Sequence, residues 1–173
     1  MLIALLLAVA PNVHAAVAAG AGTAYGYAGV HAELSVGPIG LFGGAGWGAS
    51  YVGDSEWATG RWLSSAGIPL AGGIRYAPGA DSGPFVNVTM SYFPYTYPSD
   101  DGHLTLRGAR WGYTLTAGYR FFVGGHFFVD LALGGGVAKA VDPGPTSYHG
   151  TIGPPRNELV LQPDGALGVG IRV

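Results

Sequence analysis

The stretch Arg110–Ala138, RWGYTLTAGYRFFVGGHFFVDLALGGGVA, decides the fold class of this chain. Apolar residues occupy every second position on either side of Gly124 and Gly125, and small, polar or charged residues stand between them. Successive side chains of a strand point to opposite faces of a sheet, so the stretch predicts a β-hairpin with a tight turn. One face is apolar with aromatic ends, and the other holds Gly, Thr and a few charges.

Composition narrows the class further. Only 10% of the 173 residues are charged, whereas soluble domains have about 25%. Lys139 is the single lysine, and the net charge of −2 offers no basic surface to nucleic acid. The 32 glycines fall inside the alternating segments as often as in turns, which indicates bent or tightly packed strands. With no cysteine, disulfides and thiolate metal sites are excluded.

The N-terminus predicts export. Leu2–Ala10 is a short apolar run, and Val13-His14-Ala15 resembles the small-x-small site at which signal peptides are cleaved. We therefore assign residues 1–15 to a signal peptide and 16–173 to one domain. No Lys or Arg precedes the run, so a start further upstream and an apolar segment packed in the core both stay open.

The rest of the chain repeats the alternation. Connections alternate between short and long, as in outer-membrane barrels with short periplasmic turns and long outer loops. With this arrangement, both ends of the chain lie in the periplasm only if the short, alanine-rich segment Val17–Gly22 is a strand. Counting it gives eight strands. The sequence thus predicts an all-β fold, a closed antiparallel up-and-down transmembrane β-barrel of eight strands. The expected strands are Val17–Gly22, Tyr25–Val36, Leu41–Val52, Ile68–Ala77, Phe85–Tyr95, Leu106–Val123, His126–Ala140 and Ala166–Val173.

The last segment, Leu167-Gly168-Val169-Gly170-Ile171-Arg172-Val173, places apolar residues at alternate positions. In this pattern the chain resembles the small outer-membrane barrels of the OmpX and OmpA-domain type. The resemblance implies a structural or surface-interaction protein of the bacterial outer membrane, in contact with its lipid. It also implies recognition of this last strand by the barrel assembly machinery. Members of the group end in an aromatic residue, and this chain has Val173 there.

Alternation alone leaves open which face is inside, because a soluble lipocalin-like barrel that carries an apolar ligand has apolar residues within. The weakly polar second face and the aromatic positions near strand ends favour lipid outside. The predicted lipid-facing aromatic residues are Trp47, Tyr92, Trp111, Tyr113, Tyr119, Phe121 and Phe127.

The same phase turns the charged residues of the strands inward. An eight-stranded barrel is just wide enough for side chains to fill, so charges there must pair or lie at a solvated rim. We predict that Glu33 and Asp130 pair with Arg75, Arg120 and Arg172 and fill the lumen. The full set of inward charged or titratable residues is His31, Glu33, Arg75, Arg110, Arg120, Asp130 and Arg172.

The long connections are the expected surface loops, because loops on a rigid scaffold carry most binding functions. They carry Trp57, Trp62, Asp100, Asp101, Tyr148 and His149. The carboxylates near His103 fit a solvated turn better than a metal site. A lipid A-modifying enzyme is the remaining alternative. The His-x-Ser of the outer-membrane deacylases does not occur in this chain, so we expect no catalytic residues and no cofactor.

Overall fold

The computed structural model describes residues 13–53, 60–79, 82–98, 105–141 and 159–173, which form a single antiparallel sheet. The sheet closes on itself because β1 pairs with both β2 and β10, and β7 pairs with β8. Its strands are β1 (Val13–Gly22), β2 (Tyr27–Val36), β3 (Ile39–Trp47), β4 (Ala49–Gly53), β5 (Gly60–Ser65), β6 (Leu70–Tyr76), β7 (Gly83–Pro98), β8 (Thr105–Val123), β9 (Phe127–Val141) and β10 (Leu159–Arg172).

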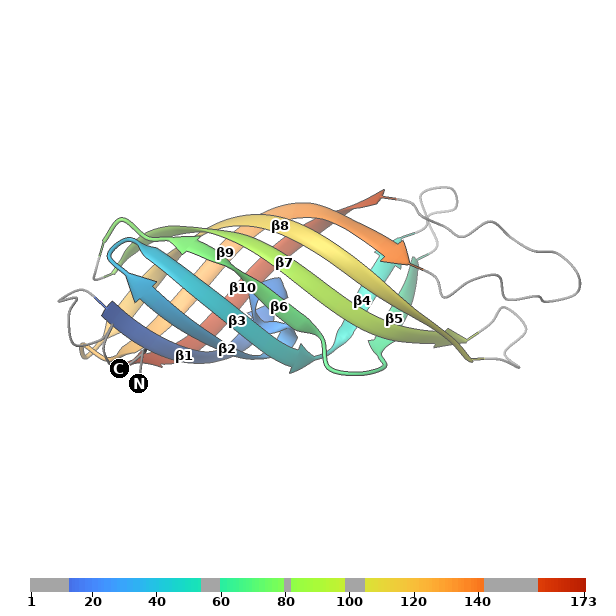
Figure 1. Cartoon of the computed structure of the whole chain (residues 1–173), viewed down its shortest axis with the longest axis horizontal. Helices are drawn as coiled ribbons and strands as arrows, with labels where there is room; N and C mark the ends of the chain where they lie inside the picture. The colour runs from blue at the N-terminus through green and yellow to red at the C-terminus, as the bar shows by residue number, and fades with distance from the viewer. Residues whose placement is uncertain (1–12, 54–59, 80–81, 99–104, 142–158) are drawn as a thin grey trace, which may run out of the picture.

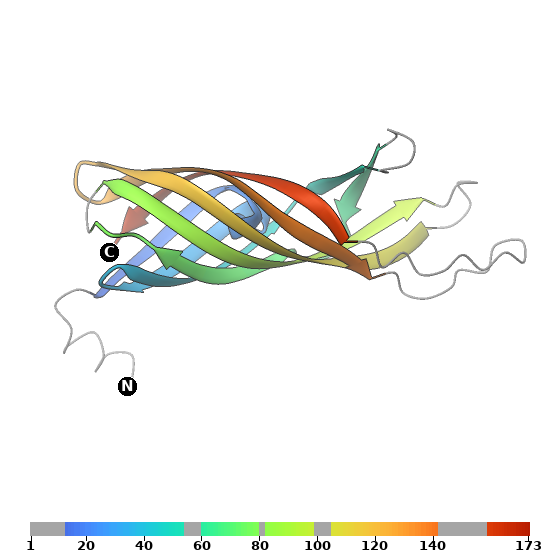
Figure 2. The ribbon, with the colours of Figure 1, turned by 90° about the horizontal axis from the view of Figure 1, so that it is seen from above.

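Eight of these strands build the wall, and the predicted closed eight-stranded barrel is confirmed. β4 follows β3 after Gly48, and β5 precedes β6, so the β4–β5 hairpin prolongs two wall strands. Figure 2 shows this hairpin diverging from the barrel, while Ser64 and Ser65 at the end of β5 still pair with β7. The predicted loop Gly53–Gly67 is therefore wrong in part: Trp62 lies on β5 and pairs in register with Tyr51. The Gly and Ser residues around this segment predict a loop, although its Trp and Leu favour a strand.

The two ends of the barrel differ (Figure 1). At one end, the turn end, β2 joins β3 through Gly37-Pro38, and β8 joins β9 through residues 124–126. Gly37, Gly124 and Gly125 have φ of 57°, 66° and 86°, a region that suits glycine. The end of β10 lies here as well, since Ala16 pairs with Arg172. The opposite end is the loop end.

Along the wall, side chains alternate between inside and outside as the hairpin predicted. On β8, Trp111, Tyr113 and Leu115 are exposed, whereas the intervening Thr114 and Thr116 are buried. Asp130 on β9 is buried, and Leu131 beside it is exposed. The apolar face of every long strand is thus the outer surface of the barrel, and the polar face fills the interior.

Three of the predicted strands differ most from the structure. β1 begins at Val13, so Val13–Ala15 of the predicted signal peptide lie in a strand, paired with β2. The strand predicted over Leu41–Val52 is interrupted at Gly48. β10 begins at Leu159, before the expected Ala166, because Pro163-Asp164-Gly165 reads as a turn yet continues the ladder with β9.

Candidate functional site

The interior of the barrel holds the candidate functional site. All seven residues predicted to face inward do so, but they do not form one group. His31, Glu33, Arg75, Arg110 and Asp130 are buried, and Arg120 and Arg172 are half-buried. Four of them meet in the half of the lumen nearer the turn end, one from each of β2, β6, β8 and β9.

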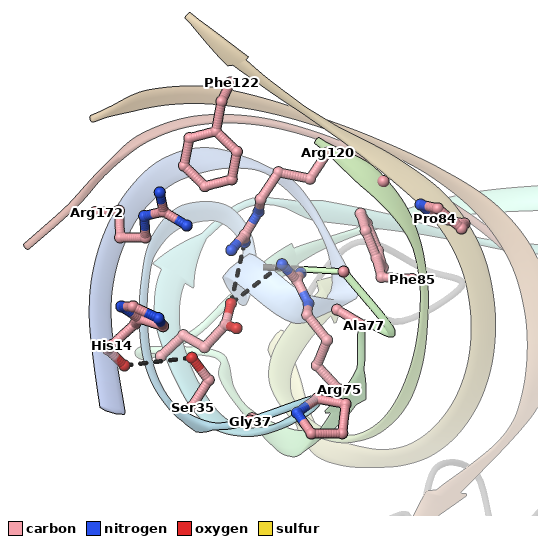
Figure 3. A pocket seen from close by; sticks show the side chains of 15 residues that line it. His14, Ser35, Gly37, Arg75, Ala77, Pro84, Phe85, Arg120, Phe122 and Arg172 are labelled. Atoms are coloured by element: carbon pink, nitrogen blue, oxygen red, sulfur yellow. Dashed lines mark hydrogen bonds and ion pairs between the residues drawn. The ribbon is translucent and has the colours of Figure 1, made fainter. Parts of the chain in front are cut away.

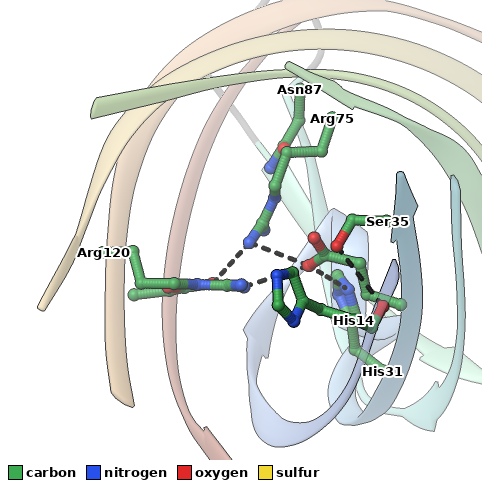
Figure 4. A network of polar contacts seen from close by, with 8 residues as sticks. His14, His31, Ser35, Arg75, Asn87 and Arg120 are labelled. Atoms are coloured by element: carbon green, nitrogen blue, oxygen red, sulfur yellow. Dashed lines mark hydrogen bonds and ion pairs between the residues drawn. The ribbon is translucent and has the colours of Figure 1, made fainter. Parts of the chain in front are cut away.

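These four side chains, Glu33, Arg75, Asp130 and Arg120, form a closed ring of alternating charge, called here the charge ring (Figure 4). Nη1 of Arg75 lies 3.1 Å from Oε2 of Glu33 and 2.9 Å from Oδ2 of Asp130. Arg120 binds Asp130 with two nitrogens, at 2.7 and 2.8 Å, and donates from Nη2 to Glu33 at 3.0 Å. Each charge thus contacts two opposite charges.

Neighbouring groups fix the ring in place. Asn87 on β7 accepts a hydrogen bond from Nε of Arg75 at 2.9 Å, so five strands hold the network. Arg75 lies over the ring of Phe85 at 4.1 Å, and Arg120 lies over Phe128 at 3.9 Å. Such stacking favours guanidinium groups and keeps water from their faces. A buried charge is strongly destabilising unless an opposite charge pairs with it. The charge ring meets this condition, because its two guanidinium groups pair with its two carboxylates.

Two predicted members lie outside the charge ring. Arg172 stacks on Phe122 at 4.1 Å, and the four side chains of the charge ring already pair with one another. Arg110 is buried ten residues before Arg120 on β8, which places it about 33 Å away along the strand at about 3.3 Å per residue. The barrel is longer than one network, so inward phase alone could not show which charges meet.

His31 lies beside Glu33, on the side of the charge ring that faces Tyr25. Its Nε2 is 3.7 Å from Oε2 of Glu33, and its imidazole stacks on Phe42 with centroids 4.8 Å apart. Both of its ring nitrogens are buried without a hydrogen-bond partner in the described structure, and so is the hydroxyl of Tyr25, whose ring centroid lies 5.2 Å away. Polar atoms of this kind in a protein interior are usually met by buried water.

The connection between β1 and β2 is the part of the interior that the sequence did not reveal. The predicted strands Val17–Gly22 and Tyr25–Val36 leave a short connection at residues 23–24, but Thr23–Tyr25 form a short 3-10 helix, η1, inside the barrel (Figure 1). Tyr25 therefore lies in η1 and not in the predicted strand. Thr23, Ala24 and Tyr25 are each at most 4% exposed. The hydroxyl of Thr23 donates to Asp164 and contacts that of Thr114 at 3.2 Å, which ties η1 to β10 and β8.

Glycines of the surrounding wall make room for η1. A Cβ on Gly168 would stand 1.8 Å from the hydroxyl oxygen of Tyr25, and one on Gly44 would stand 2.3 Å from the carbonyl oxygen of Ala24. A Cβ on Gly29 or Gly46 would also overlap the main chain of η1. The glycines on the inner face of the wall are the sequence signal for η1. They leave a section of the lumen without side chains, which another segment of the chain must fill.

A small cavity of about 40 Å³ lies at the turn end of the lumen (Figure 3). Its lining includes Glu33, Arg75 and Arg120 of the charge ring, and Arg172, His14 and Ser35 beside it. The Ser35 hydroxyl donates to the main-chain carbonyl of His14 at 3.3 Å, so the imidazole does not activate it. The contact does not resemble a catalytic serine–histidine pair.

The predicted lipid-facing aromatic residues all lie on the outer surface. Trp47, Trp111, Tyr113, Tyr119, Phe121 and Phe127 are exposed, and Tyr92 is half-buried against Trp111 with ring centroids 4.8 Å apart. Among the predicted surface-loop residues, Trp62 lies on β5. The others lie outside the described residues, and they are Trp57, Asp100, Asp101, Tyr148 and His149.

Other features of the described residues bear on function. They contain no cluster of three or more His, Cys, Asp or Glu side chains that could hold a metal ion. No helix among them has the length and apolar character needed to cross a membrane. Comparison of the chain with models of protein families, with curated proteins and with solved structures finds no match.

Proposed function

We propose that this chain is a β-barrel protein of a bacterial outer membrane with a structural or surface-interaction role and a filled lumen. The observation that carries the proposal is the distribution of charge across the wall. Among residues whose side chains are described, Lys139 is the only charged one that faces outward. Such a surface is unsuited to water, since soluble monomers rarely expose apolar patches above a few hundred Å².

The outer aromatic residues support the same orientation. Trp47, Tyr92 and Trp111 lie near the loop end, whereas Tyr119, Phe121 and Phe127 lie near the turn end. The outward-facing side chains of β8 between Trp111 and Tyr119 are Tyr113, next to the loop-end group, and then Leu115 and Ala117. Trp111 and Phe121 are ten residues apart, about 33 Å along a strand, which a tilt of about 40° reduces to about 25 Å. That is the height of the apolar band of outer-membrane barrels.

Lys139 fits this arrangement because it pairs in register with Trp111, at the level of the loop-end aromatic group. A lysine there can extend its ammonium group to the lipid headgroups. The interior argues against a soluble barrel that carries an apolar ligand, since Arg75, Asp130 and Thr116 are buried where such a ligand would lie. The charge ring and η1 fill the lumen on successive levels, so we expect a scaffold rather than an open pore.

A pair of outer-surface substitutions tests the membrane assignment. Leu115 lies midway between the aromatic groups on β8, and Val123 lies at the turn end of the same strand. In lipid vesicles, Leu115→Arg should lower the free energy of unfolding by about 2–4 kcal/mol and Val123→Arg by at most about 1 kcal/mol. The measurement is urea unfolding followed by tryptophan fluorescence. Equal losses at both positions would contradict the proposal.

The folded barrel should also migrate faster than the boiled chain in detergent gels, and it should need detergent to stay monomeric. A protease added to intact cells should cut only connections at the loop end, such as residues 99–104 or 142–158. Cleavage at the turn end instead would reverse the proposed orientation. A monomer that stays in solution without detergent would favour the soluble alternative.

A further inference from the structure

The helix η1 is joined to the wall by unusual main-chain conformations at both of its ends. Gly22 and Gly26 have φ of 117° and 63°, a region that glycine enters freely. Tyr27, the first residue of β2, has φ of 78°, and among the described residues it is the only one besides glycines with positive φ. A bulky residue rarely adopts this conformation, and where it does, the main chain is strained. Two glycines and one strained residue thus flank the three residues of η1.

The sheet does not need η1 to stay closed. The ladder between β1 and β2 ends at the pair Gly22 and Tyr27, and residues 23–26 add no pair to it. The pairing of β1 with β10 reaches Ala21, and the pairing of β2 with β3 begins at Ala28. When η1 turns about its two ends, the ladders of the wall therefore remain intact, and only contacts inside the lumen are lost.

The side-chain hydrogen bonds that hold η1 inside come from one residue. Within the described part of the chain they all involve Thr23, which binds Asp164 through its amide and its hydroxyl and contacts the hydroxyl of Thr114. Where η1 meets His31, by contrast, the hydroxyl of Tyr25 and both imidazole nitrogens are buried without a hydrogen-bond partner among the described residues. Bulk water would hydrogen-bond these atoms, so withdrawal of η1 stabilises them.

The charge ring is built independently of η1. Its four side chains come from β2, β6, β8 and β9 and contact one another directly. η1 lies between this ring and the loop end, where it connects the ends of β1 and β2. Its removal would leave a recess bordered by Asp164, Thr114 and His31, which now contact Thr23 and Tyr25. The ring would still close the inner end of that recess.

We propose that η1 is a hinged plug. It turns about Gly22 and Gly26 between the docked position of this structure and a position withdrawn towards the loop end, in which a blind polar recess opens above the charge ring. Release of main-chain strain and hydration of buried polar atoms favour withdrawal. The glycine-lined space and the contact of Thr23 with Asp164 favour docking. The inference goes beyond the scaffold role and rests on the interior alone, so it can fail while the membrane assignment stands.

Cysteine labelling tests the plug, because the chain has no cysteine of its own. Ala24 in η1 and Ala18 on β1 are both 4% exposed, so Ala24→Cys and Ala18→Cys form a matched pair. With the folded barrel in detergent micelles and a bulky water-soluble maleimide, Ala24→Cys should react at a rate that low urea does not change. Ala18→Cys should react only through global unfolding, so its rate should rise steeply with urea. The same urea dependence at both positions would overturn the proposal.

The contact of Thr23 with Asp164 gives a second comparison. Added to Ala24→Cys, Thr23→Val should raise the labelling rate about tenfold, because it removes the hydroxyl that binds the carboxylate. Thr89→Val removes the hydroxyl of a buried threonine on β7 and should leave the rate unchanged. Equal labelling rates in these two double variants would contradict a plug held by Thr23.

NMR of the unaltered chain needs no variant to fold. Exchange measurements on alanine methyl groups detect minor states that interconvert within microseconds to milliseconds, the range in which lids open. We expect a minor state at the methyl group of Ala24 and a single state at that of Ala18. A single state at both positions, or the same exchange at both, would count against a plug that moves separately from the wall.

Discussion

The two halves of the lumen are filled by different means. Towards the turn end, long side chains from five strands meet in the charge ring with Asn87, and every charge contacts two partners. Beyond it, the main chain itself enters the barrel as η1, among glycines and short hydroxyl side chains. The comparison shows that the same barrel can be filled in two ways. Long side chains from the wall can cross the lumen, or wall glycines can leave room for a segment of main chain.

The charge ring should respond most strongly to the loss of one member. Asp130→Ala leaves two buried guanidinium groups with the single carboxylate of Glu33, and removing one partner of a buried ion pair costs about 3–5 kcal/mol. We expect that loss in the free energy of unfolding, measured by urea titration in detergent micelles. A variant as stable as the parent would show that water reaches the ring and screens it.

A double substitution separates charge imbalance from lost packing. Replacing Arg120 by Met together with Asp130 by Leu leaves Glu33 and Arg75 as a balanced pair at 3.1 Å. Because apolar replacement of a buried pair is often neutral, the double variant should recover most of the stability that Asp130→Ala loses. If the loss in the double variant equals the sum of the losses in Arg120→Met and Asp130→Leu, the four charges do not act as one network.

The η1 half should respond to added volume instead. Gly168→Ala places a methyl group 1.8 Å from the hydroxyl oxygen of Tyr25, so the tyrosine must shift, at about 1–3 kcal/mol in unfolding free energy. Tyr25→Leu in the same chain removes the clash and should reduce the loss. Gly43→Ala is the matched control, because its added methyl group would meet no atom closer than 3.9 Å.

The two halves also differ in how far the sequence could predict them. Strict alternation on Arg110–Ala138 shows which side chains of this hairpin point inward, and these include Arg120 and Asp130. The same alternation on the strands of Glu33 and Arg75 sends those two residues inward. Which charges meet depends on the tilt and register of strands distant in sequence, so the separation of Arg110 was not predictable from phase. η1 lacks any periodic signal, since three residues make no pattern. The β4–β5 hairpin was missed because Gly and Ser around it also mark loops.

The contact between Thr23 and Asp164 should give the smallest of these effects, although it anchors η1 to the wall. Thr23→Val keeps the volume and removes the hydroxyl, leaving Asp164 with the Thr23 amide at 3.3 Å. We expect a loss of about 1–2 kcal/mol in unfolding free energy. Thr89→Val, an equally buried threonine of β7 outside this contact, is the control. With a fluorescent label at η1, the label should report unfolding at a lower urea concentration than the rest of the barrel in Thr23→Val. It should not do so in Thr89→Val, because only Thr23→Val removes the side-chain hydrogen bond that holds η1 to β10. If both variants unfold in one step with the same midpoint, η1 is held by the glycine-lined space itself, and its hydrogen bonds add little.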